Sequence, residues 1–175
     1  MAKWIKLFDN QYLGFWLLGL FLFVIQEIPY MVMPLFKLEA NPIMTMQESS
    51  MVLNVCEKVL GSLCIAFMTF IVHSEAKLFS IKPGKELLFF CIVIGIIELL
   101  FFGISMGILL LNFFGWFLYF TGHQSIFVML FFIVVLPPLY YVFIGLWRKN
   151  IILTVTGGLF LIVHFVHVLG NLRMR

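Results

Sequence analysis

The chain has 175 residues, of which 63% are hydrophobic and only 11% charged, whereas soluble domains have about 25% charged residues. A soluble fold of this size could not bury so much apolar surface, and the formal net charge of +3 is too small and too scattered for a nucleic-acid-binding surface. Apolar runs longer than about 18 residues indicate membrane-spanning helices. We therefore expect a single all-α domain over residues 1–175, a polytopic transmembrane helical bundle.

The first predicted span covers residues 12–36. Asp9 and Asn10 precede it and can cap the start of its helix, because short polar side chains accept hydrogen bonds from the first free backbone N–H groups. Pro29 and Pro34 should kink or loosen its far end, since proline cannot donate a helical hydrogen bond.

The second predicted span covers residues 51–73, and Ser49 or Ser50 can cap it. Four of its residues follow the i, i+3, i+4, i+7 spacing of one helix face. They are Asn54, Glu57, Lys58 and Gly61. This face is polar where contact with lipid would be unfavourable, so we expect it to point into the protein.

The third predicted span covers residues 87–111 and is uncharged except for Glu98, which should lie near mid-membrane without a basic partner at its depth. Residues 112–124 are interpreted as an aromatic interfacial segment that faces outward. Splitting this region into two spans would give a six-span alternative. Two spans in that length would be too short, so we favour five.

The fourth and fifth predicted spans cover residues 125–147 and 151–172, and a tight polar turn joins them. Pro137 and Pro138 interrupt the fourth span and free backbone carbonyls, which a membrane helix tolerates where neighbours or a cavity satisfy them. A simple packing kink is the alternative. The pair Gly157-Gly158 predicts close helix packing or self-association.

Loop charges predict the orientation. With the N-terminus inside, seven Lys and Arg residues of the loops and termini are cytoplasmic and three are outside, as the positive-inside rule requires. We therefore expect a cytoplasmic N-terminus and an external C-terminus, in the plasma membrane of a bacterium. The six-span alternative gives the same charge count, so helix length decides between them.

Polar residues of different spans fall at similar predicted depths in the outer half of the membrane. Ionisable groups there are unfavourable unless paired or hydrated, and they mark candidate functional sites. We predict a polar cavity, floored by Glu98 and the proline pair, that binds a ligand. Its candidate residues are Glu27, Glu57, Lys58, Glu98, His123, Tyr140, His164, His167 and Asn171.

Structural roles for these residues stay open. Glu27 or Glu57 could simply neutralise Lys58 in an ion pair. His164 and His167 lie on one helix face and could share a metal ion, but this spacing is weak evidence, and we expect neither a metal nor a cofactor.

Three functions are compatible with this pattern. The first is a protein that binds or transports a small molecule, ion or lipid. The second is an intramembrane lipid-modifying enzyme with a Glu/His acid–base pair. The third is an accessory or immunity-type protein without a ligand. No known catalytic motif is present, so we favour binding over catalysis, with membrane lipids as partners, no nucleic acid, and a homodimer if the protein transports.

Overall fold

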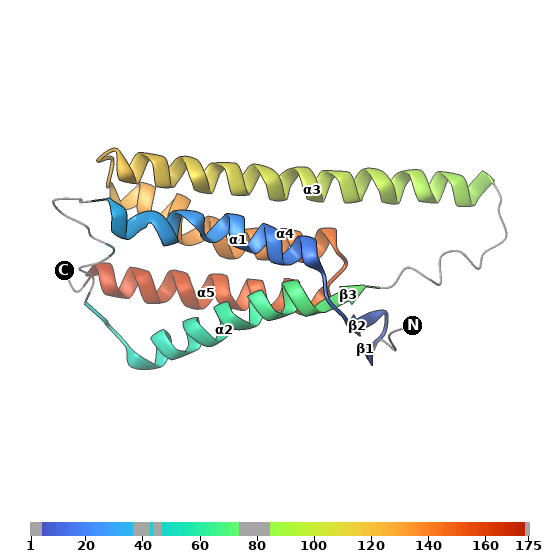
Figure 1. The fold of residues 1–175 in the computed structure, drawn as a ribbon, viewed down its shortest axis with the longest axis horizontal. Coiled ribbons are helices and arrows are strands. Elements are labelled where there is room, and N and C mark those ends of the chain that lie inside the picture. The colour runs from blue at the N-terminus through green and yellow to red at the C-terminus, as the bar shows by residue number, and fades with distance from the viewer. Residues whose placement is uncertain (1–4, 37–42, 44–46, 74–84, 174–175) are drawn as a thin grey trace.

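The computed structural model describes residues 5–36, 43, 47–73 and 85–173, and within them five helices are long and apolar enough to cross a membrane (Figure 1). Two of the five contain a second helical form: a 3-10 turn, η1, ends the first, and a π-helix, η3, begins the fourth. The helical elements are α1 (Leu17–Val32), η1 (Met33–Leu35), α2 (Met51–Phe70), α3 (Lys85–Phe120), η3 (Val128–Val135), α4 (Leu136–Trp147) and α5 (Ile151–Arg173).

A small antiparallel sheet at the N-terminal end departs from the all-α expectation. Its strands are β1 (Ile5–Phe8), β2 (Gln11–Leu13) and β3 (Ile71–His73), in the order β1-β2-β3 (Figure 1). Asp9 has a φ of 43° in the turn between β1 and β2. Asp tolerates this left-handed conformation better than most residues, so it forms the hairpin turn and does not cap α1. The helix begins at Leu17, after Trp16 as its N-cap.

The far end of α1 and the start of α2 follow their sequence signals. Ser50 is the N-cap of α2, and its side chain accepts a hydrogen bond from the Leu53 backbone N–H. Pro29 is accommodated inside α1, whereas Pro34 lies in the 3-10 turn that replaces the last α-helical turn. The predicted cap and the predicted loosening are therefore confirmed.

Asn150 ties three elements together at the end of the bundle that carries the sheet. Its Oδ1 accepts the Leu153 backbone N–H at 3.0 Å and thereby caps α5. Its Nδ2 donates to the carbonyl oxygens of Phe67 and Ile71, at 3.0 and 3.3 Å, where α2 ends and β3 begins. Beside it, Gln11 Nε2 donates to the Lys149 carbonyl at 2.7 Å and attaches β2 to the same turn.

The third helix is longer than we predicted, because α3 continues through Leu111 to Phe120 as one unbroken helix. Residues 112–120 therefore do not form a separate interfacial segment. Trp116 and Tyr119, expected in an aromatic belt at the membrane surface, are only 1% and 0% exposed. They pack with Met33 in a core cluster where α1, α3 and η3 meet.

Helix α4, with η3 before it, is the central element. The most apolar 18-residue stretch of the fourth helix lies between Val128 and Trp147, and 61% of it is buried. In the four other apolar helices of the described residues, the buried share of the corresponding stretch is at most 28%. Gly145 allows close contact with α5, because a Cβ there would lie 2.7 Å from the Thr154 backbone nitrogen. Gly157 has a tight contact with α4, whereas nothing lies within 4 Å of a Cβ at Gly158.

The proline pair breaks the hydrogen-bond ladder of the fourth helix beside α1 and α3. The Ile133 carbonyl is four residues before Pro137 and five before Pro138, so neither an α-helical nor a π-helical N–H can reach it. Tyr30 of α1 donates its hydroxyl to this carbonyl at 3.2 Å. Asn112 of α3 donates to the adjacent Phe132 carbonyl at 2.7 Å. Neighbouring helices therefore donate to two carbonyls at the break, including the Ile133 carbonyl that the prolines leave free.

We expect Gly145→Ala to lower the free energy of unfolding by about 1–3 kcal/mol, because the new methyl group collides with the α5 backbone. Reversible unfolding in mixed micelles would measure the change. Gly158→Ala is the matched control and should be neutral or gain up to about 1 kcal/mol from helix propensity. Equal losses in both variants would contradict this account of the α4–α5 contact.

We expect Tyr30→Phe to cost about 1–3 kcal/mol of unfolding free energy, because it leaves the Ile133 carbonyl without a donor. In a Pro137→Ala background the chain regains a backbone N–H at position 137, so the same change should cost clearly less. The four unfolding free energies form a double-mutant cycle. A cost of Tyr30→Phe that is the same in both backgrounds would show that the hydroxyl does not act through this carbonyl.

Candidate functional site

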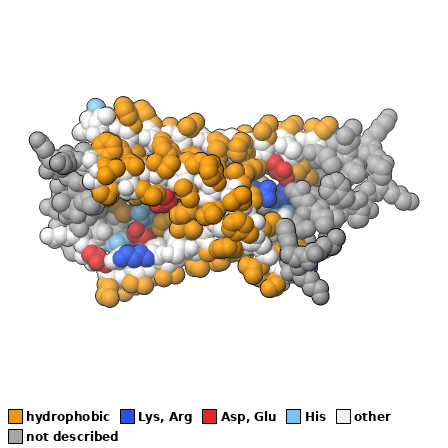
Figure 2. All heavy atoms as spheres, in the orientation of Figure 1, with side chains coloured by type: hydrophobic (Ala, Val, Ile, Leu, Met, Phe, Trp, Pro, Cys, Tyr) orange, Lys and Arg blue, Asp and Glu red, His pale blue; other side chains and the backbone are white. Residues whose placement is uncertain are grey.

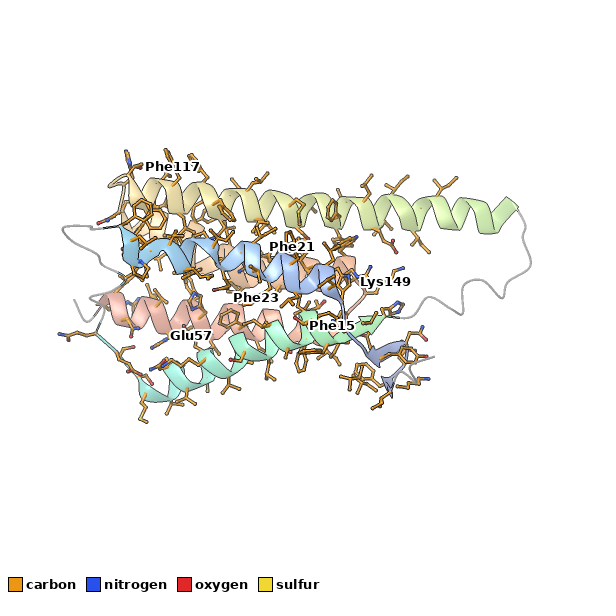
Figure 3. All side chains as sticks on the ribbon, in the orientation of Figure 1. Phe15, Phe21, Phe23, Glu57, Phe117 and Lys149 are labelled. Carbon is orange, nitrogen blue, oxygen red and sulfur yellow. The ribbon has the colours of Figure 1, made fainter. Side chains whose placement is uncertain are left out.

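Charged and histidine side chains gather toward the end of the bundle that carries the C-terminus, among hydrophobic side chains (Figure 2). Glu57 of α2 lies there, facing α5 (Figure 3). Its two carboxylate oxygens contact two histidines of α5. His164 Nδ1 lies 3.1 Å from Oε1, and His167 Nδ1 forms a hydrogen bond with Oε2. The three-residue spacing of the histidines lets one carboxylate reach both rings.

The hydrogen bonds of His167 continue toward the C-terminal end of α5. Its Nε2 lies 3.3 Å from the amide nitrogen of Asn171, whose carbonyl oxygen accepts the Ser49 backbone N–H at 2.7 Å. A neutral imidazole with its proton on Nδ1 satisfies both contacts, donating to Glu57 and accepting from Asn171. The network thus joins the start of α2 to the end of α5.

A cavity of about 200 Å³ lies beside this network. Four of the apolar helices contribute to its wall, and α3 does not. We call it the Glu27 cavity, and it is lined by Gln26, Glu27 and Tyr30 of α1, Glu57, Gly61 and Ile65 of α2, Pro137 and Tyr141 of α4, and Phe160 and His164 of α5.

Two side chains of α1 in this wall lack polar partners. Glu27 is partly buried, and within the described part of the chain it has neither a hydrogen bond nor an ion pair. Gln26 is 1% exposed, and its Oε1 has no hydrogen-bond partner. Buried polar groups are almost always paired in folded proteins. The wall of the Glu27 cavity thus has two acceptor groups without a protein partner, on adjacent residues of α1.

The structure brings five of the nine predicted site residues together. Glu27, Glu57 and His164 line the cavity, and His167 and Asn171 support Glu57 from the side of α5.

Lys58, His123 and Tyr140 lie outside the cavity wall. Lys58 is exposed and forms no ion pair with Glu27 or Glu57, so the structural ion pair that we considered is absent. His123 is exposed beyond the end of α3, with its Nδ1 3.3 Å from the Thr121 hydroxyl. Tyr140 is buried in the core, where its hydroxyl has no partner.

Glu98 is a correction to the predicted site. Its Oε1 lies 2.5 Å from Lys149 Nζ in the α4–α5 turn, at the opposite end of the bundle from Glu57 (Figure 3). It therefore neither floors the cavity nor lacks a basic partner. Because α3 runs far beyond its expected end, Glu98 lies at the level of this turn and not in the middle of the bundle. Of the predicted floor, Pro137 alone lines the cavity.

Metal binding finds no support in the geometry. Within the residues that the structure describes, no group of three or more His, Cys, Asp or Glu side chains is arranged to hold a metal ion.

Sequence analysis missed two tyrosines of the wall, Tyr30 and Tyr141, and its apolar residues, Ile65 and Phe160. Such residues are too common in this chain to stand out. Their spacing from the predicted polar residues could have identified two of them as wall residues. Tyr30 follows Glu27 by three positions, and Phe160 precedes His164 by four. Both intervals place the two side chains on one helix face.

Comparison with known protein families, curated proteins and solved structures finds no match. The chemistry of the Glu27 cavity is therefore the basis for assigning a function.

We expect Glu57→Gln to lower the free energy of unfolding by about 1–3 kcal/mol, because it weakens the contacts that join α2 to both histidines of α5. Lys58→Gln is the matched control at the next position and should change it by less than about 0.5 kcal/mol, since that side chain is exposed. Unfolding in mixed micelles measures both. Equal effects would show that the Glu57 network does not hold the helices together.

Proposed function

We propose that this chain is a five-span integral membrane protein, with its N-terminus inside and C-terminus outside, that binds a small ligand in the Glu27 cavity. The unpaired Glu27 carboxylate, on a helix apolar enough to cross a membrane, carries this proposal. An uncompensated charge at such a position is unfavourable, and natural proteins retain one mainly where it serves a function. The unpartnered Gln26 amide beside it supports the same conclusion.

The size of the cavity limits the ligand. Pockets for drug-sized molecules measure about 300–1,000 Å³, whereas this one measures about 200 Å³. A small molecule, an ion or the head group of a lipid fits the available space, and a whole lipid molecule does not. Binding needs only this chain. Transport would additionally require a homodimer, because five helices are too few for a two-fold repeat around a central site.

The contact between Glu57 and His164 supports a second candidate function, an intramembrane lipid-modifying enzyme. A carboxylate that orients an imidazole at a cavity wall is a common arrangement for general acid–base catalysis. The two candidates differ in their products. A binding protein returns its ligand unchanged, whereas the enzyme yields a chemically altered lipid that mass spectrometry of the lipid extract would detect.

We expect native mass spectrometry of gently released protein to show a small bound molecule that Gly61→Leu removes. A Cβ at Gly61 lies 3.4 Å from the Phe160 ring, so the first carbon fits and the rest of the leucine side chain fills the cavity. Gly158→Leu, with nothing within 4 Å of its Cβ, is the control and should retain the molecule. A bare wild-type protein, or a ligand that survives Gly61→Leu, would contradict binding at this site.

A further inference from the structure

We infer that the ligand of the Glu27 cavity carries a primary ammonium group on a short hydrocarbon chain. The inference rests on the proposed function and specifies its ligand class. In this assignment the Glu27 carboxylate is the counter-ion, and the Gln26 carbonyl accepts a second ammonium N–H.

The unused hydrogen-bonding groups of the cavity wall favour a donor of positive charge. In its ionised form Glu27 can only accept hydrogen bonds, and the side-chain carbonyl of Gln26 is an acceptor without a partner at the same wall. Tyr30 already donates its hydroxyl to the Ile133 carbonyl. A ligand with several N–H donors therefore satisfies the two unpaired acceptors of α1, Glu27 and the Gln26 carbonyl.

The charges of the wall exclude an anionic ligand. Glu27 and Glu57 are the two carboxylates, and His164 is the one lining side chain that can become positive. His164 lies 3.1 Å from Glu57, so a positive charge on its ring would lie beside that carboxylate and not beside Glu27. Glu27 has no such partner within the described residues. A neutral ligand would leave its charge unbalanced, and an anion would add repulsion.

The apolar part of the wall favours an organic cation over a metal ion. Ile65, Pro137, Tyr141 and Phe160 offer hydrocarbon and ring surface to a short aliphatic chain. The described residues include no metal-binding group of three ligands. The volume of about 200 Å³ corresponds to roughly six or seven water molecules at about 30 Å³ each, which suits a small alkylamine.

A free alkylamine and the ethanolamine head group of a phospholipid share this chemistry. Both present a primary ammonium group on a short carbon chain. The site chemistry is the same in either case, and the source of the ligand is a matter for the experiment.

The test compares n-butylammonium with 1-butanol, which has the same chain length without the charge, by calorimetric titration of the full chain in dodecyl maltoside micelles. We expect butylammonium to bind at least about tenfold more tightly, because a charge-assisted hydrogen bond replaces a neutral one. Glu27→Gln should abolish this preference. Glu48→Gln, the same change at an exposed carboxylate, should keep it.

The source is decided in lipid nanodiscs of phosphatidylglycerol with and without phosphatidylethanolamine. Retention of phosphatidylethanolamine by the wild type, and its loss in Glu27→Gln, assigns the head group. Binding of butylammonium that phosphatidylethanolamine does not weaken assigns a free amine. Either result supports the ammonium site.

Equal affinities for amine and alcohol, a preference that survives Glu27→Gln, or no binding of either compound would overturn the ammonium assignment. The wild-type comparison needs no variant, so a folding defect of Glu27→Gln would not obscure it. If Gly61→Leu removes a retained ligand in native mass spectrometry while the ammonium test fails, the cavity binds a ligand of another class. If both experiments fail, the proposed function fails as well.

Discussion

The hydrocarbon core of a membrane offers no water to a backbone group that lacks a partner, so the protein itself must supply one. The fourth apolar helix illustrates this constraint, because Pro137 and Pro138 leave the Ile133 carbonyl without any helical donor. Tyr30 from α1 supplies that donor, and Asn112 from α3 supplies one for the adjacent Phe132 carbonyl. Two helices are thereby held against the most buried of the five apolar helices that the structure describes.

The same constraint positions the candidate site. Tyr30 can reach the Ile133 carbonyl only if its face of α1 points toward the fourth helix, and Glu27 lies one turn earlier on that face. The carboxylate is therefore brought beside Pro137 by a contact that serves the backbone. On the other side, the Glu57 network fixes α2 against α5. The cavity lies between these two polar contacts.

The sequence was sufficient for the features that depend on local chemistry: the apolar helices, a serine cap at the start of α2 and the proline-loosened end of the first apolar helix. The predicted polar face of α2 is correct only in part, because Glu57 and Gly61 line the cavity whereas Lys58 is exposed. The sequence was insufficient where contacts between segments far apart in the chain determine the structure. Glu98 finds Lys149 only because α3 and the α4–α5 turn reach the same level, and no local pattern reveals that. Pairing of residues 71–73 with the N-terminal hairpin is likewise non-local. The aromatic end of α3 was misassigned because Trp and Tyr suit both a membrane surface and a buried cluster.

In a membrane, the length of α3 would affect the surrounding bilayer. Its stretch Ile92–Phe120 has 29 residues, or roughly 44 Å of helix, whereas the hydrocarbon core of a typical membrane is about 30 Å thick. An apolar helix that exceeds the bilayer must tilt or thicken the lipid around it. Asn112 joins α3 to the break in the fourth helix, close to Pro137 of the cavity wall, so a tilt of α3 would pull on this hydrogen bond.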